Sequence, residues 1–414
     1  MTERTKNIKK IVISTLFILA VTFLIGLLPV KTEFPKLIKS EVEDYDVYDL
    51  HFAGRHLDEQ AVKRMEKDTS IVLIQLADTR GAIADQLQLL AKYHPAVIGV
   101  DALFRSASSD SLGDLTLSMA QARIPNIIWA SKMEVDTNTK KVRLQHSYFE
   151  DPDARQREAY GNFIGEDLAS VRVFSPFVEI EDTQRFSFTA KILQQYRPDQ
   201  FKKLERRDHH EEAINYTGNL ELFPHFTKDD LYLYDSTDQL EGKLEGKVVL
   251  LGFFKTEAPL ILQDLHYTPL NEHVAGKSLP DMYGVVIHAN ILRMMLEEKY
   301  ITRVPGIYSY LISGLLVAGF LWLEWYFARR KGKHPSFLFH LGEVILLMLL
   351  VYLFLVIFSA TFYKFYLFPI IFSFIVKGFH ETLMKKCLVI WEWLREKTLK
   401  FWPKPSRQKK VKRS

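Results

Sequence analysis

SIVLIQLADTRGAIADQLQLLAKYHPAVIGVD (residues 70–101) contains the pattern that decides the fold class. Two apolar, β-branched runs, 70–76 and 96–100, flank a segment whose apolar residues recur at helical spacing. The second run closes on Asp101. Strands this apolar are typical of a parallel sheet that is buried on both faces. The stretch therefore predicts a strand, a helix and a second strand of an α/β domain.

Further elements of both kinds follow this unit along the chain. We expect helices at 112–122 and 187–195, strands at 126–130, 171–177, 213–215 and 247–254, and a hairpin within 131–145. The charge-rich segment 197–212 is expected to be a solvated surface segment. The fold class is therefore α/β, with one mostly parallel sheet and helices on both of its faces.

Residues 280–303, PDMYGVVIHANILRMMLEEKYITR, also have apolar residues at helical spacing, including Val286, Ile291 and Met295. The far end of this stretch reaches a long uncharged run that begins at Pro305. The pattern predicts a single helix, which would act as a lever between the α/β domain and the membrane.

Apolar runs long enough to cross a bilayer occur at both ends of the chain. They predict one N-terminal and three C-terminal α-helical transmembrane segments, at 11–30, 305–328, 337–358 and 361–378. The first run lacks a small-x-small cleavage pattern, so we interpret it as an uncleaved signal anchor.

Charge predicts the orientation of these segments. Lys and Arg are concentrated in residues 1–10, in the loop after the second span and in the tail 379–414, which places all three on the cytoplasmic side. Residues 31–304 carry 33 Lys+Arg against 44 Asp+Glu, a net charge of −11, whereas the whole chain is +4. We therefore expect a multi-pass membrane protein with a large acidic domain on the extracytoplasmic side. Nothing in its charge indicates nucleic-acid binding.

Several short motifs in this domain occur in a characteristic order. They are Asp78 with Arg80, Asp101 with Phe104, Gly161-Asn162 with Arg172, Asp264 with Thr268-Pro269, and YGVVIHAN at 283–290. With the arrangement of the spans, they resemble the class 2 CHASE domain, an extracytoplasmic sensor of bacterial histidine kinases, nucleotide cyclases and diguanylate cyclases. The resemblance covers residues 35–303 and implies a sensory role in a bacterial inner membrane, with the acidic domain in the periplasm. The tail 379–414 is too short for a catalytic output domain, so a separate signalling partner is expected.

The first group of candidate ligand-binding residues follows the two strands of the opening stretch. Asp78 and Arg80 come after the first strand, and Asp101 comes after the second, where α/β folds place their binding crevice. Two carboxylates there suit a cation or a hydroxyl-rich ligand. The alternative is that one of them caps a helix and the other pairs with Arg80 or Arg105.

The second group lies around the start of the predicted lever helix. Asp264, His266 and Thr268 precede the helix, and His288 and Asn290 lie in its first turns. These side chains are candidates for ligand binding, and imidazole with carboxylate also suits zinc. The alternative is that they tie the loop to the helix by hydrogen bonds. No resident metal or cofactor is expected.

Three functions are consistent with these patterns. The first is a non-enzymatic sensor that binds an unknown small-molecule or envelope ligand and signals through its spans, with a homodimer as one open assembly. The second is an envelope scaffold without ligand sensing. The third is an envelope hydrolase built on Asp101, Asp264 and His288, although the chain has no recognised nucleophile or metalloprotease motif.

Overall fold

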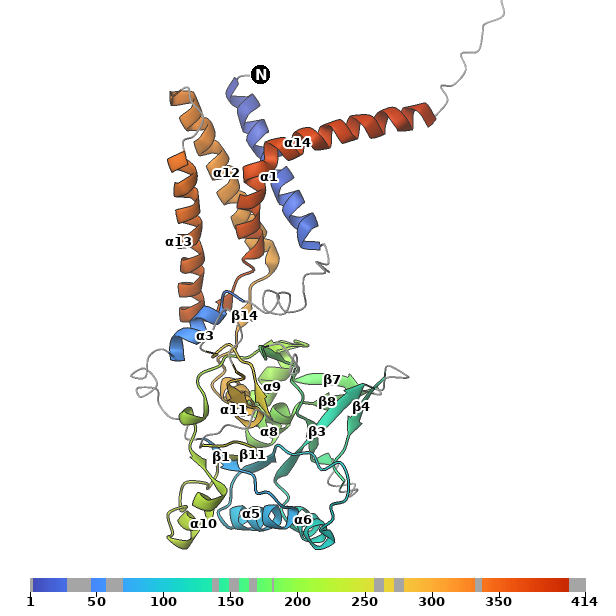
Figure 1. Cartoon of the computed structure of the whole chain (residues 1–414), viewed down its shortest axis with the longest axis vertical. Coiled ribbons are helices and arrows are strands. Elements are labelled where there is room, and N and C mark those ends of the chain that lie inside the picture. The colour runs from blue at the N-terminus through green and yellow to red at the C-terminus, as the bar shows by residue number, and fades with distance from the viewer. Residues whose placement is uncertain are drawn as a thin grey trace, which may run out of the picture. The chain divides into compact units, whose positions relative to one another are not determined.

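The computed structural model describes ten segments of the 414-residue chain: 3–27, 46–56, 70–135, 141–148, 156–163, 170–180, 182–256, 264–271, 279–331 and 337–401. The chain divides into two compact units (Figure 1). One is the α/β unit, Thr32–Ile301, and the other is the helical unit, which joins Met1–Lys31 to Thr302–Ser414.

The α/β unit is built on a seven-stranded sheet with the order β10-β1-β11-β2-β3-β4, in which β5 also pairs with β3. All pairings except β3 with β4 are parallel, which confirms the expected mostly parallel sheet. The strands are β1 (Ile71–Gln75), β2 (Val97–Val100), β3 (Ile127–Val135), β4 (Val142–Gln145), β5 (Glu158–Tyr160), β10 (His225–Phe226) and β11 (Val248–Gly252).

Helices cover both faces of this sheet (Figure 1). On one face, α5 (Arg80–Lys92), α6 (Ser111–Arg123) and α10 (Lys228–Ser236) share a core cluster with alternate strand residues. On the other face lie α8 (Phe188–Tyr196) and α11 (Gly284–Leu296). These two helices approach the strands at glycines, since a Cβ at Gly99 would lie 2.8 Å from Ile192 and one at Gly252 would lie 2.5 Å from Val285.

The strand order contains one arrangement that we did not expect. We predicted that the first two strands would be neighbours, but β11 lies between them and pairs with both. Every residue of β11 is buried, and a strand without polar side chains belongs at the centre of a sheet. The carboxyl ends of β1, β11 and β2 therefore lie side by side.

Other elements surround this sheet. The segment 197–212 is mostly exposed, as predicted, and it contains α9 (Pro198–Arg207), which buries Phe201 and Leu204 on one face. The hairpin predicted within 131–145 is confirmed by the pairing of β3 with β4. The short elements are α3 (Asp49–His56), β6 (Val173–Phe174), β7 (Phe177–Ile180), β8 (Thr183–Phe186), β9 (Glu212–Ala213), the 3-10 helix η1 (Leu220–Leu222), β12 (Leu265–His266) and β13 (Met282–Tyr283).

The predicted lever helix is shorter than expected. Helix α11 ends at Leu296, and Glu298 has a positive φ of 56°, which a continuing helix does not allow. The chain then forms β14 (Thr302–Arg303) before the next helix begins at Gly306. The prediction of one helix as far as Arg303 was therefore wrong, and the connection contains a turn and a strand.

The helical unit contains α1 (Glu3–Leu27), α12 (Gly306–Lys331), α13 (Phe337–Thr361) and α14 (Phe368–Phe401), and its strand β14 pairs with β15 (Tyr363–Lys364). Three stretches are long and apolar enough to cross a membrane: Thr5–Leu27, Gly306–Arg330 and Phe339–Thr361. They coincide with three of the predicted spans. The fourth, at 361–378, overlaps the start of α14 and stays a prediction.

Buried charges link three helices of this unit. Lys377 of α14 has a side chain only 4% exposed, and its ammonium pairs with Glu324 of α12 and Glu343 of α13. His340 Nδ1 lies 3.1 Å from Oε2 of Glu343. A buried ammonium is costly unless it is paired, so these contacts are required for the helices to pack in this arrangement.

Candidate functional site

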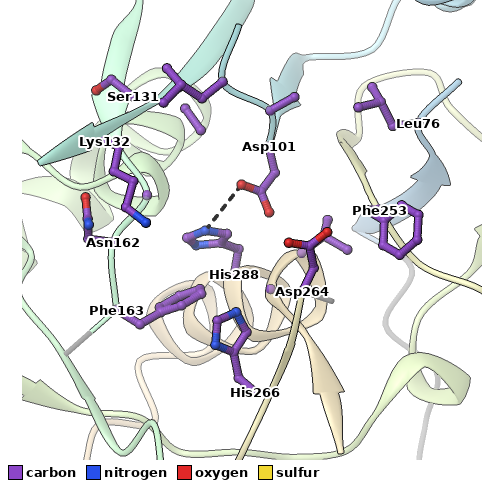
Figure 2. Close-up of a pocket in the computed structure, with 16 residues that line it drawn as sticks. Leu76, Asp101, Ser131, Lys132, Asn162, Phe163, Phe253, Asp264, His266 and His288 are labelled. Atoms are coloured by element: carbon purple, nitrogen blue, oxygen red, sulfur yellow. Dashed lines mark ion pairs between the residues drawn. The ribbon is translucent and has the colours of Figure 1, made fainter. Parts of the chain in front are cut away.

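A cavity of about 520 Å³ opens at the carboxyl ends of the parallel strands in the α/β unit. Its wall is formed by residues at the carboxyl ends of β1, β11, β2 and β5, by residues 130–132 of β3, and by the first turns of α11 (Figure 2). This is the position where open α/β sheets bind ligands, because the strands end there and loops and helix N-termini provide polar groups.

Asp101 follows β2 directly and enters the cavity from the centre of the sheet. A quarter of its side-chain surface remains exposed. No residue in the described segments donates a hydrogen bond to its carboxylate. Burial, with a smaller contribution from the negative charge of Asp264, raises the pKa of Asp101 to about 7. At neutral pH the carboxyl group is therefore divided between its protonated and ionised forms.

His288 lies opposite Asp101, one helical turn after Gly284 in α11. Its ring packs against Phe163, with centroids 4.5 Å apart, and against Phe188, at 5.0 Å. Burial, with a smaller contribution from His266, lowers the pKa of His288 to about 3. Its Nδ1 is buried and has no hydrogen-bond partner among the described residues. The imidazole is thus neutral at physiological pH.

Asp264 and His266 reach the cavity from the short hairpin of β12 and β13, in which His266 pairs with Met282. The second strand of this hairpin leads directly into α11. Gly284 keeps the space between these groups open, because a Cβ there would lie 3.6 Å from both Asp101 Oδ2 and His266 Nε2. The loop and the helix start therefore bring Asp264, His266 and His288 to one cavity.

Asp78 and Arg80 lie elsewhere and do not line this cavity. Strand β1 ends at Gln75, so the chain has already turned before it reaches Asp78, which is 76% exposed and pairs with Lys228. Arg80 begins α5 and pairs with Asp114 at 2.5 Å. Thr79 caps α5 and Asp110 caps α6, so neither Asp78 nor Asp101 has the capping role that we considered.

Thr268 and Asn290 have the structural role given as the alternative for the second group. The hydroxyl of Thr268 donates to Asp281 at 2.5 Å. Oδ1 of Asn290 accepts a hydrogen bond from the backbone N–H of Thr217 at 2.9 Å, and its amide donates to the Gly218 carbonyl at 2.9 Å. Both side chains are almost fully buried. They hold loops against α11 and do not line the cavity.

The sequence did not identify all of the lining residues. Lys132, Phe163 and Phe253 line the cavity, but none of them was a candidate. Lys132 was missed because it belongs to the predicted hairpin, which the sequence alone does not place at the cavity. A signal for Phe163 was available in the Gly161-Asn162 pair, which precedes it directly and also lines the cavity.

The comparisons with known proteins identify the family. The family of the CHASE2 domain matches residues 20–323, which is most of the chain. No curated protein and no solved structure gives a match. CHASE2 domains are extracytoplasmic and sensory, which agrees with the cavity in the α/β unit and with three helices able to cross a membrane. The chain belongs to the CHASE2 domain family.

Proposed function

We propose that this protein is a bacterial inner-membrane sensor whose extracytoplasmic α/β unit binds a small ligand in the cavity. It then passes a conformational signal through its membrane helices to a separate partner. The family membership and the three apolar helices support this proposal. The distribution of Lys and Arg favours a multi-pass topology with the α/β unit outside. Binding, without turnover of the ligand, is the role that we assign to the site.

The main support for this proposal is that neither Asp101 nor His288 has a hydrogen-bond partner for its side chain among the described residues. His288 is buried and Asp101 is partly buried, and both line the cavity. An unpaired buried polar group costs about 1–3 kcal/mol, so proteins rarely retain one without a function. A ligand that bonds both groups would recover this cost.

The cavity is lined in part by α11, the helix that precedes the membrane helix α12 in the chain. Gly284, Val285 and His288 belong to both the cavity wall and α11. Helix α11 is connected to α12 by residues 297–305, which are not helical. A ligand that binds two positions of α11 with different affinities would shift the equilibrium between them, which is the requirement for signalling.

The test uses the full-length chain in lipid nanodiscs and a library of amino acids, sugars, nucleotides and metal ions. We expect at least one compound to raise the thermal unfolding temperature of the α/β unit. Asp101→Asn should abolish this shift. The control is Asp78→Asn, which removes a carboxylate that is outside the cavity. Absence of any shift, or equal shifts in both variants, would refute the proposal.

A further inference from the structure

The polar groups at the centre of the cavity are mainly hydrogen-bond acceptors. Asp101 and Asp264 contribute carboxylates, and a neutral imidazole such as that of His288 has one acceptor nitrogen. Nε2 of His288 lies 3.9 Å from Oδ1 of Asp101, which is too long for a hydrogen bond. A group that donates to both is needed between them.

If the cavity is the ligand site of a sensor, as proposed above, its chemistry indicates what it binds. We propose that the cavity holds the primary ammonium group of a small zwitterion such as an amino acid, with Asp101, Asp264 and His288 around the ammonium and Lys132 facing the anionic end.

A primary ammonium satisfies the geometry of this gap. It carries three N–H donors, and a nitrogen about 2.8 Å from each atom would bridge Asp101 and His288. Its charge also compensates the two carboxylates, whose mutual repulsion contributes to the raised pKa of Asp101. A hydroxyl group has one donor and no charge, so it would leave Asp264 uncompensated.

A divalent metal fits the same gap poorly. A zinc ion about 2.1 Å from both atoms would form an angle of about 136° between them, far from the tetrahedral value. Within the described segments, a set of three mutually close metal-ligand groups occurs only in the helical unit, at Glu324, His340 and Glu343. There the ammonium of Lys377 already pairs with both carboxylates.

The rest of the cavity favours a zwitterion over a simple cation. Lys132 extends into it from β3, on the side away from Asp264 (Figure 2). A carboxylate at that end would gain a contact with the Lys132 ammonium, which a simple cation would not. Leu76 and Phe253 form an apolar wall on the other side, which suits a short aliphatic or aromatic body.

The experiment measures thermal shifts of the full-length chain in nanodiscs with the twenty standard amino acids, 4-aminobutanoate and ethanolamine. Each compound is paired with its N-acetyl derivative, which has no ammonium group. We expect at least one zwitterion to stabilise the protein and its N-acetyl derivative to have no effect. Lys132→Gln should weaken binding of the zwitterion at least tenfold but leave ethanolamine binding within about twofold.

Three further variants show whether the thermal shift depends on the polar groups of the cavity. Asp101→Asn and His288→Gln should each abolish the shift, and Asp78→Asn should retain it, with far-UV circular dichroism as the check of folding. If only sugars, nucleotides or metal ions give shifts that depend on Asp101, the ammonium site is refuted and the sensor proposal stands. If no compound of either set gives a shift, both are refuted.

Discussion

Nε2 of His288 lies 3.9 Å from Oδ1 of Asp101, and the two groups do not form an ion pair at neutral pH. An ion pair would lower the pKa of Asp101 and raise that of His288. The pKa values move in the opposite directions, to about 7 and about 3, because burial disfavours both charged forms. At neutral pH the cavity wall therefore carries the half-protonated carboxyl group of Asp101 beside the neutral imidazole of His288.

Ligand binding is expected to depend on pH through Asp101. An ammonium ligand needs the ionised carboxylate, and with a pKa of about 7 the ionised fraction rises from about one tenth at pH 6 to about nine tenths at pH 8. The affinity should therefore increase about tenfold over this interval, as measured by calorimetry on the full-length chain. An affinity that is constant or that increases toward acidic pH would contradict the assignment.

Asp101→Asn is expected to stabilise the ligand-free protein. The pKa of Asp101 is higher in the folded state than in the unfolded chain, so the folded state binds more protons between about pH 4 and pH 7 and loses stability as the pH rises through this range. Asn cannot ionise, so the variant does not lose this stability. Its free energy of unfolding should exceed that of the unsubstituted protein by about 2–4 kcal/mol at pH 8 and by little at pH 4. Chemical unfolding at both pH values tests this, and Asp78→Asn should change stability by less than about 0.5 kcal/mol.

Gly284→Ala is expected to impair binding without impairing folding. The added Cβ would lie 3.6 Å from Asp101 Oδ2 and His266 Nε2, which is an ordinary contact distance. It would nevertheless occupy space between the polar groups of the cavity. We expect at least a tenfold loss of ligand affinity with an unchanged unfolding temperature. Gly81→Ala, in the first turn of α5 and outside the cavity, is the matched control and should retain full affinity.

Gly252→Ala is expected to destabilise the α/β unit. A Cβ at this position would lie 2.5 Å from Cβ of Val285, so β11 and α11 would have to separate. Overpacking of this kind costs about 1–3 kcal/mol. Thermal unfolding should show the loss, whereas Gly81→Ala, whose added Cβ would meet only an ordinary contact at 3.8 Å, should leave the unfolding temperature unchanged. Equal unfolding temperatures for Gly252→Ala and the unsubstituted protein would show that steric conflict at this position has no cost.

Lys377→Met is expected to destabilise the helical unit, because it leaves Glu324 and Glu343 buried without their cation. Breaking a buried ion pair on one side costs about 3–5 kcal/mol. The unfolding temperature in detergent should fall accordingly. Adding Glu324→Gln and Glu343→Gln should recover most of the stability, since no unpaired charge then remains. An unaffected single variant would show that these charges are solvated.

Local patterns in the sequence were sufficient to predict most individual elements. The strands before Asp101 and after Lys247 are apolar throughout, and the apolar residues between the first two strands recur at helical spacing. These local patterns were sufficient to predict the α/β fold class. Asp101 was correctly placed because it follows its strand directly. Asp78 was misplaced because Leu76 and Ala77 separate it from the end of β1, and the chain turns before it.

Long-range pairing was the part that the sequence could not predict. The apolar run 247–254 is typical of a central strand, but the insertion of β11 between β1 and β2 depends on pairing between segments distant in sequence, and a local pattern does not contain that information. The same holds for Lys132, whose place in the cavity depends on the pairing of β3 with both β4 and β5. The end of α11 was missed because Glu297, Glu298 and Lys299 are good helix formers, and only the backbone turn at Glu298 ends the helix.

The insertion of β11 between β1 and β2 also constrains the biogenesis of the protein. Residues 71–100 cannot form their sheet until residues 248–252 are present, so the nascent chain must emerge almost as far as α11 before its central strands can pair. Contacts this distant in sequence make folding slow and leave apolar strands exposed to aggregation in the meantime. Fragments of the domain that stop before residue 248 lack the strand that joins β1 to β2, and we expect them not to fold.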